Sequence, residues 1–229
     1  NLACTHCYLP HHKNSGALSF DDWCRVVDQY KDLLDKLYMQ PNITICGGEP
    51  LLSPFLFPLV KVIRGTFPCC EICILTNGIL VTPKIAAEMK KWDLRAQVSI
   101  EGPDAGRHDI YRGAGSFAKT MAGCALLREA EVSFHHLSIL SERTAAWIPD
   151  FFDLAKETGA TKMNFVRLVA FGHAESLVAG GADRPLSGWT LKKAFEDMLY
   201  FSRAKGVGTN TNKALFHLIE PGLGSPNNI

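Results

Sequence analysis

The stretch EICILTNG, residues 71–78, shows the unit from which the rest of the chain is built. Its apolar and β-branched run ends at Asn77-Gly78, a pair that turns the chain readily, so residues 71–76 are predicted to form a strand. Apolar residues then recur at helical spacing over Pro83–Trp92, and a second apolar run follows at Ala96–Ile100. Strand, turn, helix and strand in this order predict a βα unit on a parallel sheet.

The same alternation continues on both sides of this stretch. It predicts helices at Ser19–Leu37, Pro54–Arg64, Phe117–Glu129, Trp147–Thr158 and Leu191–Lys205, and strands at Ile43–Cys46, Val132–Leu140, Lys162–Val169 and from Val207 onward. Five or six such units are too few for a full barrel, which needs eight units and about 250 residues. We therefore predict an α/β fold, a partial (β/α)6 TIM-like barrel, with one further strand expected before Asn1.

The composition is that of an ordinary globular protein. The chain has 229 residues, of which 47% are hydrophobic, and its net charge is +1. This small charge favours neither nucleic acid nor an anionic membrane as a partner, and no apolar run is long enough to predict a membrane span. Residues 1–229 are predicted to form one domain. Because the chain starts without Met and without a signal segment, we expect a fragment trimmed at both ends.

The eight cysteines are expected to be reduced. Disulfide scaffolds are usually small and loop-rich, and this chain is neither, so a cytoplasmic location is predicted. Cys46 lies in an apolar run, and Cys69-Cys70-x-x-Cys73 surrounds the start of a predicted strand. All four cysteines are therefore expected to pack as small apolar side chains. His135 and His136 follow each other on one strand, and their rings are therefore predicted to face opposite sides.

The segment Cys4-Thr-His6-Cys7 is the first candidate for chemistry. Alone, Cys-x-x-Cys fits a redox pair or half of a metal site. Three turns that follow predicted strands are further candidates: Gly47-Gly48-Glu49-Pro50, Thr76-Asn77-Gly78 and Glu101-Gly102-Pro103. The carboxyl ends of parallel strands share one edge, so these turns should meet on one rim. Two adjacent glycines let the backbone approach a ligand there, and Glu49 adds negative charge.

Together these motifs resemble the radical S-adenosylmethionine (SAM) family. Residues 1–8 look like its Cys-x-x-x-Cys-x-aromatic-Cys signature, with the first cysteine expected immediately before Asn1. The resemblance implies that Cys4 and Cys7 ligate a [4Fe–4S] cluster. It also implies that His6 occupies the aromatic position beside the adenine of SAM.

The same resemblance implies which residues bind SAM. They are Gly47, Gly48, Glu49 and Pro50 at the amino group, Thr76 and Asn77 near the SAM site, Ser99 and Arg112 at the ribose or carboxylate, and Leu168 beside the adenine. An arginine suits a carboxylate because its planar fork donates two hydrogen bonds.

Two later motifs resemble one branch of the family. Ser99-x-Glu101-Gly102 and His108-Asp109-x-x-Arg112-Gly113 are similar to the SPASM-type branch, which includes peptide-modifying maturases and anaerobic sulfatase maturases. Glu101 stands where that branch usually has Asp. His108 and Asp109 are expected to be loop residues, and the alternative role for Arg112 is a surface ion pair with Asp109 or Asp104.

The resemblance implies an oxidoreductase that cleaves SAM reductively to a 5′-deoxyadenosyl radical, which abstracts hydrogen from a peptide or protein substrate. It also implies a one-electron donor of the flavodoxin or ferredoxin type and, in such relatives, a C-terminal domain with auxiliary clusters. Three alternatives stay open. They are a radical SAM enzyme acting on a small molecule, a cluster-free barrel acting as a binding module, and a zinc module built on Cys4, His6 and Cys7.

Overall fold

The structure is a computed structural model that describes residues 1–7 and 17–211. The strands are β1 (Asn42–Ile45), β2 (Glu71–Thr76), β3 (Leu94–Ser99), β4 (Phe134–Leu140), β5 (Lys162–Arg167) and β6 (Gly208–Thr211). The helices are α1 (Phe20–Leu37), a 3₁₀ turn η1 (Pro50–Leu52), α2 (Leu56–Thr66), α3 (Pro83–Lys91), α4 (Ala105–Arg112), α5 (Ser116–Glu129), α6 (Glu142–Ala145), α7 (Ile148–Thr158), α8 (His173–Ala179) and α9 (Gly188–Lys205).

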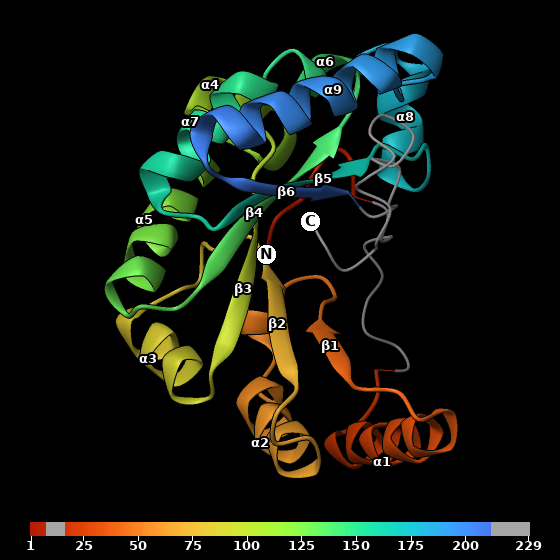
Figure 1. Cartoon of the computed structure of the whole chain (residues 1–229), viewed down its shortest axis with the longest axis vertical. Coiled ribbons are helices and arrows are strands. Elements are labelled where there is room, and N and C mark those ends of the chain that lie inside the picture. The colour runs from red at the N-terminus through yellow and green to blue at the C-terminus, as the bar shows by residue number, and fades with distance from the viewer. Residues whose placement is uncertain (8–16, 212–229) are drawn as a thin grey trace.

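The six strands form one parallel sheet in which neighbours in sequence are neighbours in space, from β1 to β6. The sheet is curved, and helices α2, α3, α5, α7 and α9 lie along its convex side (Figure 1). This half-barrel confirms the predicted partial barrel. Because every strand pair is parallel, the carboxyl ends of the strands share one edge, where the predicted site motifs lie.

The core lies between the sheet and the outer helices. On β5, Met163 and Phe165 are fully buried, and the rings of Phe151 and Phe152 on α7 lie 5.7 and 6.3 Å from the ring of Phe165. Burying a side chain of this size contributes roughly 1.5–3 kcal/mol. Side chains alternate along a strand, so Asn164 between them faces the inner, concave side of the sheet.

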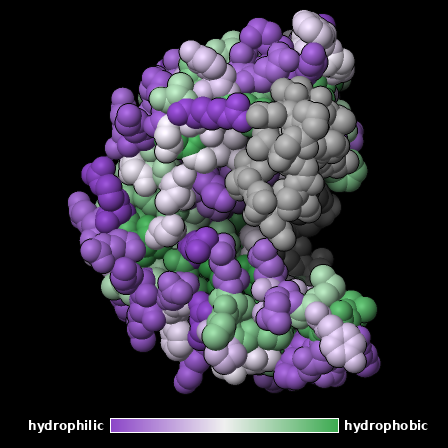
Figure 2. Space-filling model, viewed as in Figure 1, coloured by the Kyte–Doolittle hydropathy of each residue, from purple (hydrophilic) through white to green (hydrophobic). Residues whose placement is uncertain are grey.

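Helix α1 begins after an N-cap serine, Ser19, the first residue of the predicted range. The Ser19 hydroxyl accepts from the Asp22 N–H at 3.2 Å, and the Asp22 carboxylate accepts from the Ser19 N–H at 2.9 Å, which forms a capping box. Val27 and Leu34 are the buried residues of this helix. Phe20 and Tyr30 are half-buried against the core, whereas four large apolar residues of α1 stay exposed: Trp23, Val26, Leu33 and Leu37. Figure 2 shows apolar surface at the lower right, where α1 lies.

Strand β1 is more exposed than the sequence predicted. Its residues alternate between exposed and half-buried, and Cys46 directly after it is exposed. The prediction that Cys46 packs in the interior is therefore wrong. The reason is position, because β1 is an edge strand whose one partner in the described part of the sheet is β2.

Three short helices were not predicted, and one of them corrects a site prediction. His108 and Asp109 were expected in a loop but belong to α4, whose N-cap Asp104 accepts from the Arg107 N–H at 2.9 Å. From α4, the Asp109 carboxylate accepts from the N–H groups of Gly115 at 2.6 Å and Phe117 at 2.9 Å. It thereby caps α5, which has no cap from its own N-cap residue, a glycine.

Within residues 17–211, none of the helices combines the length and hydrophobicity that a membrane span needs.

Candidate functional site

Residues 1–7, called the cysteine segment below, lie on the rim and are anchored there by backbone hydrogen bonds. Cys7 N–H donates to the Cys4 carbonyl at 3.2 Å, so the two cysteines flank one tight turn. Thr5 N–H donates to the carbonyl of Tyr111 on α4 at 2.9 Å, and His173 N–H at the start of α8 donates to the Cys7 carbonyl at 2.9 Å. Elements distant in sequence therefore hold both thiols in place.

A first group of predicted residues gathers around the Glu49 carboxylate, which is 7% exposed. Its Oε1 accepts from the Thr76 hydroxyl at 2.7 Å and the Leu51 N–H at 3.2 Å, and its Oε2 accepts from the Asn77 N–H at 2.9 Å. The Thr76 hydroxyl in turn accepts from Gly78 N–H at 3.0 Å. The turns after β1 and β2 therefore meet, as the sequence predicted.

The backbone of this first group is open on one side. A Cβ atom placed on Gly47 or Gly48 would meet no atom within 4 Å, and both residues are exposed. Pro50, in contrast, is buried at the start of η1. The two glycines therefore present bare peptide groups to an open space that a ligand can enter.

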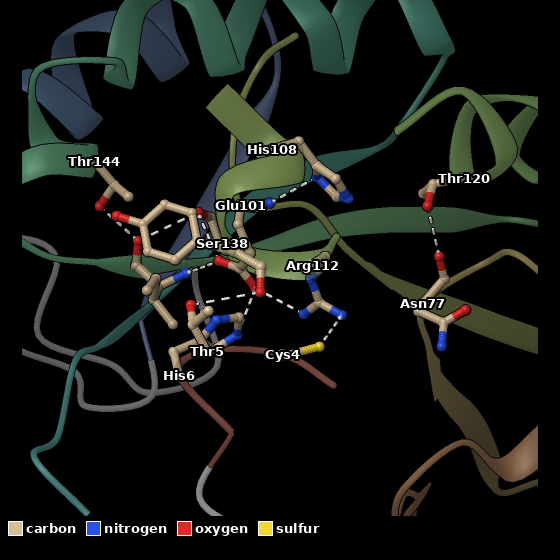
Figure 3. A network of polar contacts seen from close by, with 12 residues as sticks. Cys4, Thr5, His6, Asn77, Glu101, His108, Arg112, Thr120, Ser138 and Thr144 are labelled. Atoms are coloured by element: carbon tan, nitrogen blue, oxygen red, sulfur yellow. Dashed lines mark hydrogen bonds and ion pairs between the residues drawn. The ribbon is translucent and has the colours of Figure 1, made fainter. Parts of the chain in front are cut away.

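A second group gathers around Glu101, which follows β3 and is 2% exposed (Figure 3). Its Oε1 lies 3.2 Å from His6 Nε2 and accepts from Arg112 Nη2 at 2.7 Å. Its Oε2 accepts from the Ile139 N–H at 2.9 Å and from the Ser138 hydroxyl at 3.4 Å. Arg112 thus pairs with a buried glutamate, not with Asp109 or Asp104 at the surface.

Charge in this second group is strongly coupled. Burial alone raises the pKa of the Glu101 carboxyl, but the charges of His6 and Arg112 and the hydrogen bonds outweigh it, so the net pKa is well below its usual range. Burial lowers the pKa of Arg112, yet Glu101 and Cys4 reverse this and raise it overall. Burial raises the pKa of the Cys4 thiol, and the nearby Arg112 partly counters the effect. The Glu101 carboxylate and the Arg112 guanidinium are therefore both fully ionised at neutral pH.

His108 contacts the second group from α4. Its Nδ1 accepts from the Glu101 backbone N–H at 3.1 Å, which requires a neutral ring. Burial, followed by the charge of Arg112, lowers the pKa of His108 to about 4, in agreement with that role.

The cysteine segment joins the two groups. Asn77 Nδ2 donates to Asn1 Oδ1 at 2.8 Å on one side, and Arg112 Nη1 lies 3.9 Å from Cys4 Sγ on the other. The rim is therefore one continuous site that runs from the turn after β1 to the end of α4, where Arg112 lies.

Ser99 and Leu168 lie at strand ends but outside these contacts. Ser99 is half-buried as the last residue of β3. Leu168 follows β5 and is buried with Tyr111, Ile139 and Ala174 in a small apolar cluster beside the second group. Their predicted contacts with SAM stay predictions.

The sequence placed Glu101 in a turn on the rim but predicted no cofactor contact for it. Its signal was present, since a carboxylate directly after a strand of a parallel sheet lies on the rim by topology alone.

The unpartnered atoms of the site fit a bound group. Arg112 Nε and His6 Nδ1 are buried and have no hydrogen-bond partner within the described residues. A buried polar atom without a partner costs about 1–3 kcal/mol, which a ligand can recover. The donor types also fit, because thiolates of Cys4 and Cys7 suit iron and a guanidinium suits the carboxylate of SAM.

The remaining candidates do not form sites. Cys70 and Cys73 are buried and Cys69 is exposed. His135 Nε2 pairs with Gln97 and His136 Nε2 with Thr158, both at 2.8 Å, so the two rings have separate partners as predicted. Among residues 1–7 and 17–211, no three His, Cys, Asp or Glu side chains are arranged to hold a metal ion.

Comparison with known proteins agrees with the site. A family model described as the radical SAM superfamily matches residues 1–155. An AdoMet-dependent heme synthase from Methanosarcina barkeri is 32% identical over 179 residues, which cover 76% of this chain and 49% of that protein. The mycofactocin maturase MftC from Mycobacterium tuberculosis is 33% identical over 168 residues, which cover 70% of this chain and 40% of that protein. The chain thus spans about half the length of these curated relatives or less.

Solved structures share the fold. Streptococcus suis SuiB bound to S-adenosylmethionine matches with a TM-score of 0.75 and 15% identity, over 97% of this chain and 50% of that chain. SuiB bound to its precursor peptide SuiA matches with a TM-score of 0.73 and 15% identity, over 97% and 48%. Such low identity establishes the fold alone. The sequence matches establish more: the chain belongs to the radical SAM superfamily, a family of enzymes that use a [4Fe–4S] cluster and SAM.

Proposed function

We propose that this chain is the core of a radical SAM enzyme of the SPASM-type branch and that its substrate is a peptide or protein. One observation carries the proposal. The cysteine segment lies on the same rim as the glycine turn and the buried carboxylates, and the contacts of Asn1 with Asn77 and of Cys4 with Arg112 tie it there.

The protein's own part is to bind and orient the two cofactors. Cys4 and Cys7 ligate the cluster from their shared turn. The open peptide groups of Gly47 and Gly48 receive the amino group of SAM, and Glu49 is the nearby negative charge. When bound and reduced, the cluster supplies the electron that breaks a carbon–sulfur bond of SAM and gives methionine and a 5′-deoxyadenosyl radical.

The other predicted residues complete the SAM site. The free Nε of Arg112 is a donor for the SAM carboxylate, and Ser99 at the end of β3 is a partner for the ribose. Leu168, in its buried apolar cluster, is the neighbour of the adenine and keeps water from that side. His6 stands at the aromatic position of the cysteine motif.

A peptide substrate is supported by the relatives. MftC is a maturase, and SuiB has been solved with a precursor peptide. A one-electron donor of the flavodoxin or ferredoxin type and a cytoplasmic location belong to the same proposal. The location is supported by the cysteines of the described residues, all of which are free thiols.

A small-molecule substrate is the second candidate. It is favoured by the AdoMet-dependent heme synthase from M. barkeri, since heme is a small molecule. Deuterium transfer into 5′-deoxyadenosine distinguishes the two. If the substrate is a peptide, the deuterium is expected to come from the peptide fraction of a deuterated cell extract. If the substrate is a small molecule, the deuterium is expected to come from the small-molecule fraction.

The test of SAM cleavage uses the intact protein, prepared anaerobically with iron and sulfide. After reduction with dithionite and addition of SAM, 5′-deoxyadenosine is expected to form. Cys4→Ala and Cys7→Ala are expected to reduce it to background, because each removes a cluster ligand. Cys69→Ala is the matched control, since Cys69 is an exposed thiol, and it should keep full activity. A loaded cluster without any 5′-deoxyadenosine would leave a barrel that only binds its ligand, without SAM cleavage, as the better explanation.

A further inference from the structure

The Glu101 carboxylate lies at the centre of the site, yet no predicted cofactor contact uses it. One of its oxygens joins His6 to Arg112, and the other is fixed by the Ile139 N–H. The carboxylate therefore joins the cysteine segment, α4 and β4, which are far apart in the sequence. Removing it would release all three at once.

The side chain of Arg112 lies between this carboxylate and Cys4. Its Nη2 lies 2.7 Å from Glu101 Oε1, and its Nη1 lies 3.9 Å from Cys4 Sγ. The side chain of Arg112 is 11% exposed and that of Glu101 is 3% exposed, so both are almost fully buried. In such surroundings a unit charge a few ångströms away acts strongly, because little water screens it.

When Cys4 ligates a cluster as a thiolate, the charges along this line are negative at Glu101, positive at Arg112 and negative at Cys4. Glu101 neutralises the guanidinium, so the thiolate faces a paired cation and not a free one. A free cation at that distance would favour the more negative, reduced state of any cluster held by Cys4. Glu101 opposes that effect.

We propose that Glu101 is a positioning residue that holds His6 and Arg112 against the cysteine segment and keeps the reduction potential of the cluster low. This inference rests on the proposed function, because it presupposes a cluster on Cys4 and Cys7. The inference concerns the reduction potential of the cluster, whereas the proposed function concerns the cleavage of SAM. Either one can therefore fail without the other.

The experiment measures the cluster's midpoint potential by redox titration followed by electron paramagnetic resonance, on the intact reconstituted protein without SAM. Glu101→Gln keeps the shape and removes the charge, and it is expected to make reduction about tenfold more favourable, a positive shift of about 59 mV for one electron. Arg112→Gln removes the cation instead and is expected to shift the potential in the opposite direction.

Two further variants separate charge from shape. Glu101→Asp keeps the charge on a shorter side chain, so its potential should stay near that of the wild type while its cluster content falls. Glu142→Gln makes the same change of net charge at an exposed residue and should leave the potential unchanged.

Shifts of opposite sign in Glu101→Gln and Arg112→Gln would support the proposal, because a merely structural role gives no reason for opposite signs. Equal potentials in all variants would overturn it. Equal loss of cluster from all three site variants, with the control intact, would also overturn it. A wild-type protein that assembles no cluster would instead refute the proposed function.

Discussion

Gly102 lies between Glu101 and helix α4, and it has no room for a side chain. A Cβ atom there would lie 2.4 Å from the Arg107 carbonyl carbon and the His108 nitrogen, both backbone atoms of α4. Gly48 is the opposite case, with nothing within 4 Å. The first glycine is required by packing inside the protein, whereas the second leaves space in front of the rim.

Gly102→Ala is expected to lower the free energy of unfolding by about 1–3 kcal/mol, because α4 must move away from the strand end. Gly48→Ala is expected to change it by less than about 0.5 kcal/mol and to weaken SAM binding, because the methyl group enters the open space. Urea unfolding and calorimetric titration with SAM measure the two effects. Full SAM affinity in Gly48→Ala would remove this turn from the proposed binding site.

The residues of the first group could be predicted from the sequence, but the contacts of the second could not. Glu49, Thr76 and Asn77 follow neighbouring strands, and the ends of parallel strands share an edge whatever the details of packing. Glu101 also follows a strand, but its partners depend on the path of the cysteine segment and on α4. That path is set by tertiary contacts, which no local pattern reveals.

Among the elements, α4 has the most connections to the site. Its Tyr111 carbonyl holds the cysteine segment, and the Tyr111 hydroxyl donates to Asp183 at 2.6 Å. Asp183, in the segment between α8 and α9, also accepts from the Ser141 hydroxyl at 2.6 Å. Burial, and then Asp183, raise the pKa of Tyr111, so it remains a protonated donor. One buried carboxylate therefore joins α4, the start of α6 and the segment after α8.

Tyr111→Phe is expected to lower the free energy of unfolding by about 1–3 kcal/mol, because it leaves the buried Asp183 with one donor fewer. Tyr200→Phe is the matched control, since Tyr200 is 66% exposed, and it should change stability by less than about 0.5 kcal/mol. Thermal and urea unfolding measure both. Equal stability of the two variants would show that the Tyr111 hydroxyl does not stabilise the fold.

Long elements were predicted well because their patterns repeat. Residues Glu71–Thr76 form a strand with the predicted bounds, and the α1 prediction was correct to the N-cap. Helices α4, α6 and α8 have 8, 4 and 7 residues, so they show too few turns for a helical period to be recognised. The polar N-caps of α4 and α6, Asp104 and Ser141, were the available signal, whereas α8 begins after a glycine.

At the scale of the whole molecule, the sheet holds neutral histidines in its interior. Burial, with a smaller effect of His135, lowers the pKa of His136 to about 3. Burial, with the charges of Lys162 and Arg95, lowers the pKa of His135 to about 4. Both values lie far below that of an unfolded chain, about 6.5. The folded protein therefore binds fewer protons than the unfolded chain in mild acid.

Stability is expected to be full above about pH 6.5 and to fall as the pH drops toward the folded pKa values, because unfolding then takes up protons. Each of the two histidines contributes a slope of up to about 1.4 kcal/mol per pH unit between about pH 6 and 4. His136→Gln should reduce the slope by about that amount. Urea unfolding at a series of pH values from 7 to about 4 measures it. The same slope in wild type and variant would show that His136 is already charged in the folded protein.

The anchoring of the cysteine segment also has a consequence for the order of events during synthesis. Cys4 and Cys7 leave the ribosome well before the residues that hold their turn, Tyr111 and His173. The two hydrogen bonds that anchor the turn can therefore form only after α4 and the start of α8 have been made. On the proposed function, insertion of a cluster at Cys4 and Cys7 is expected to follow the synthesis of these elements.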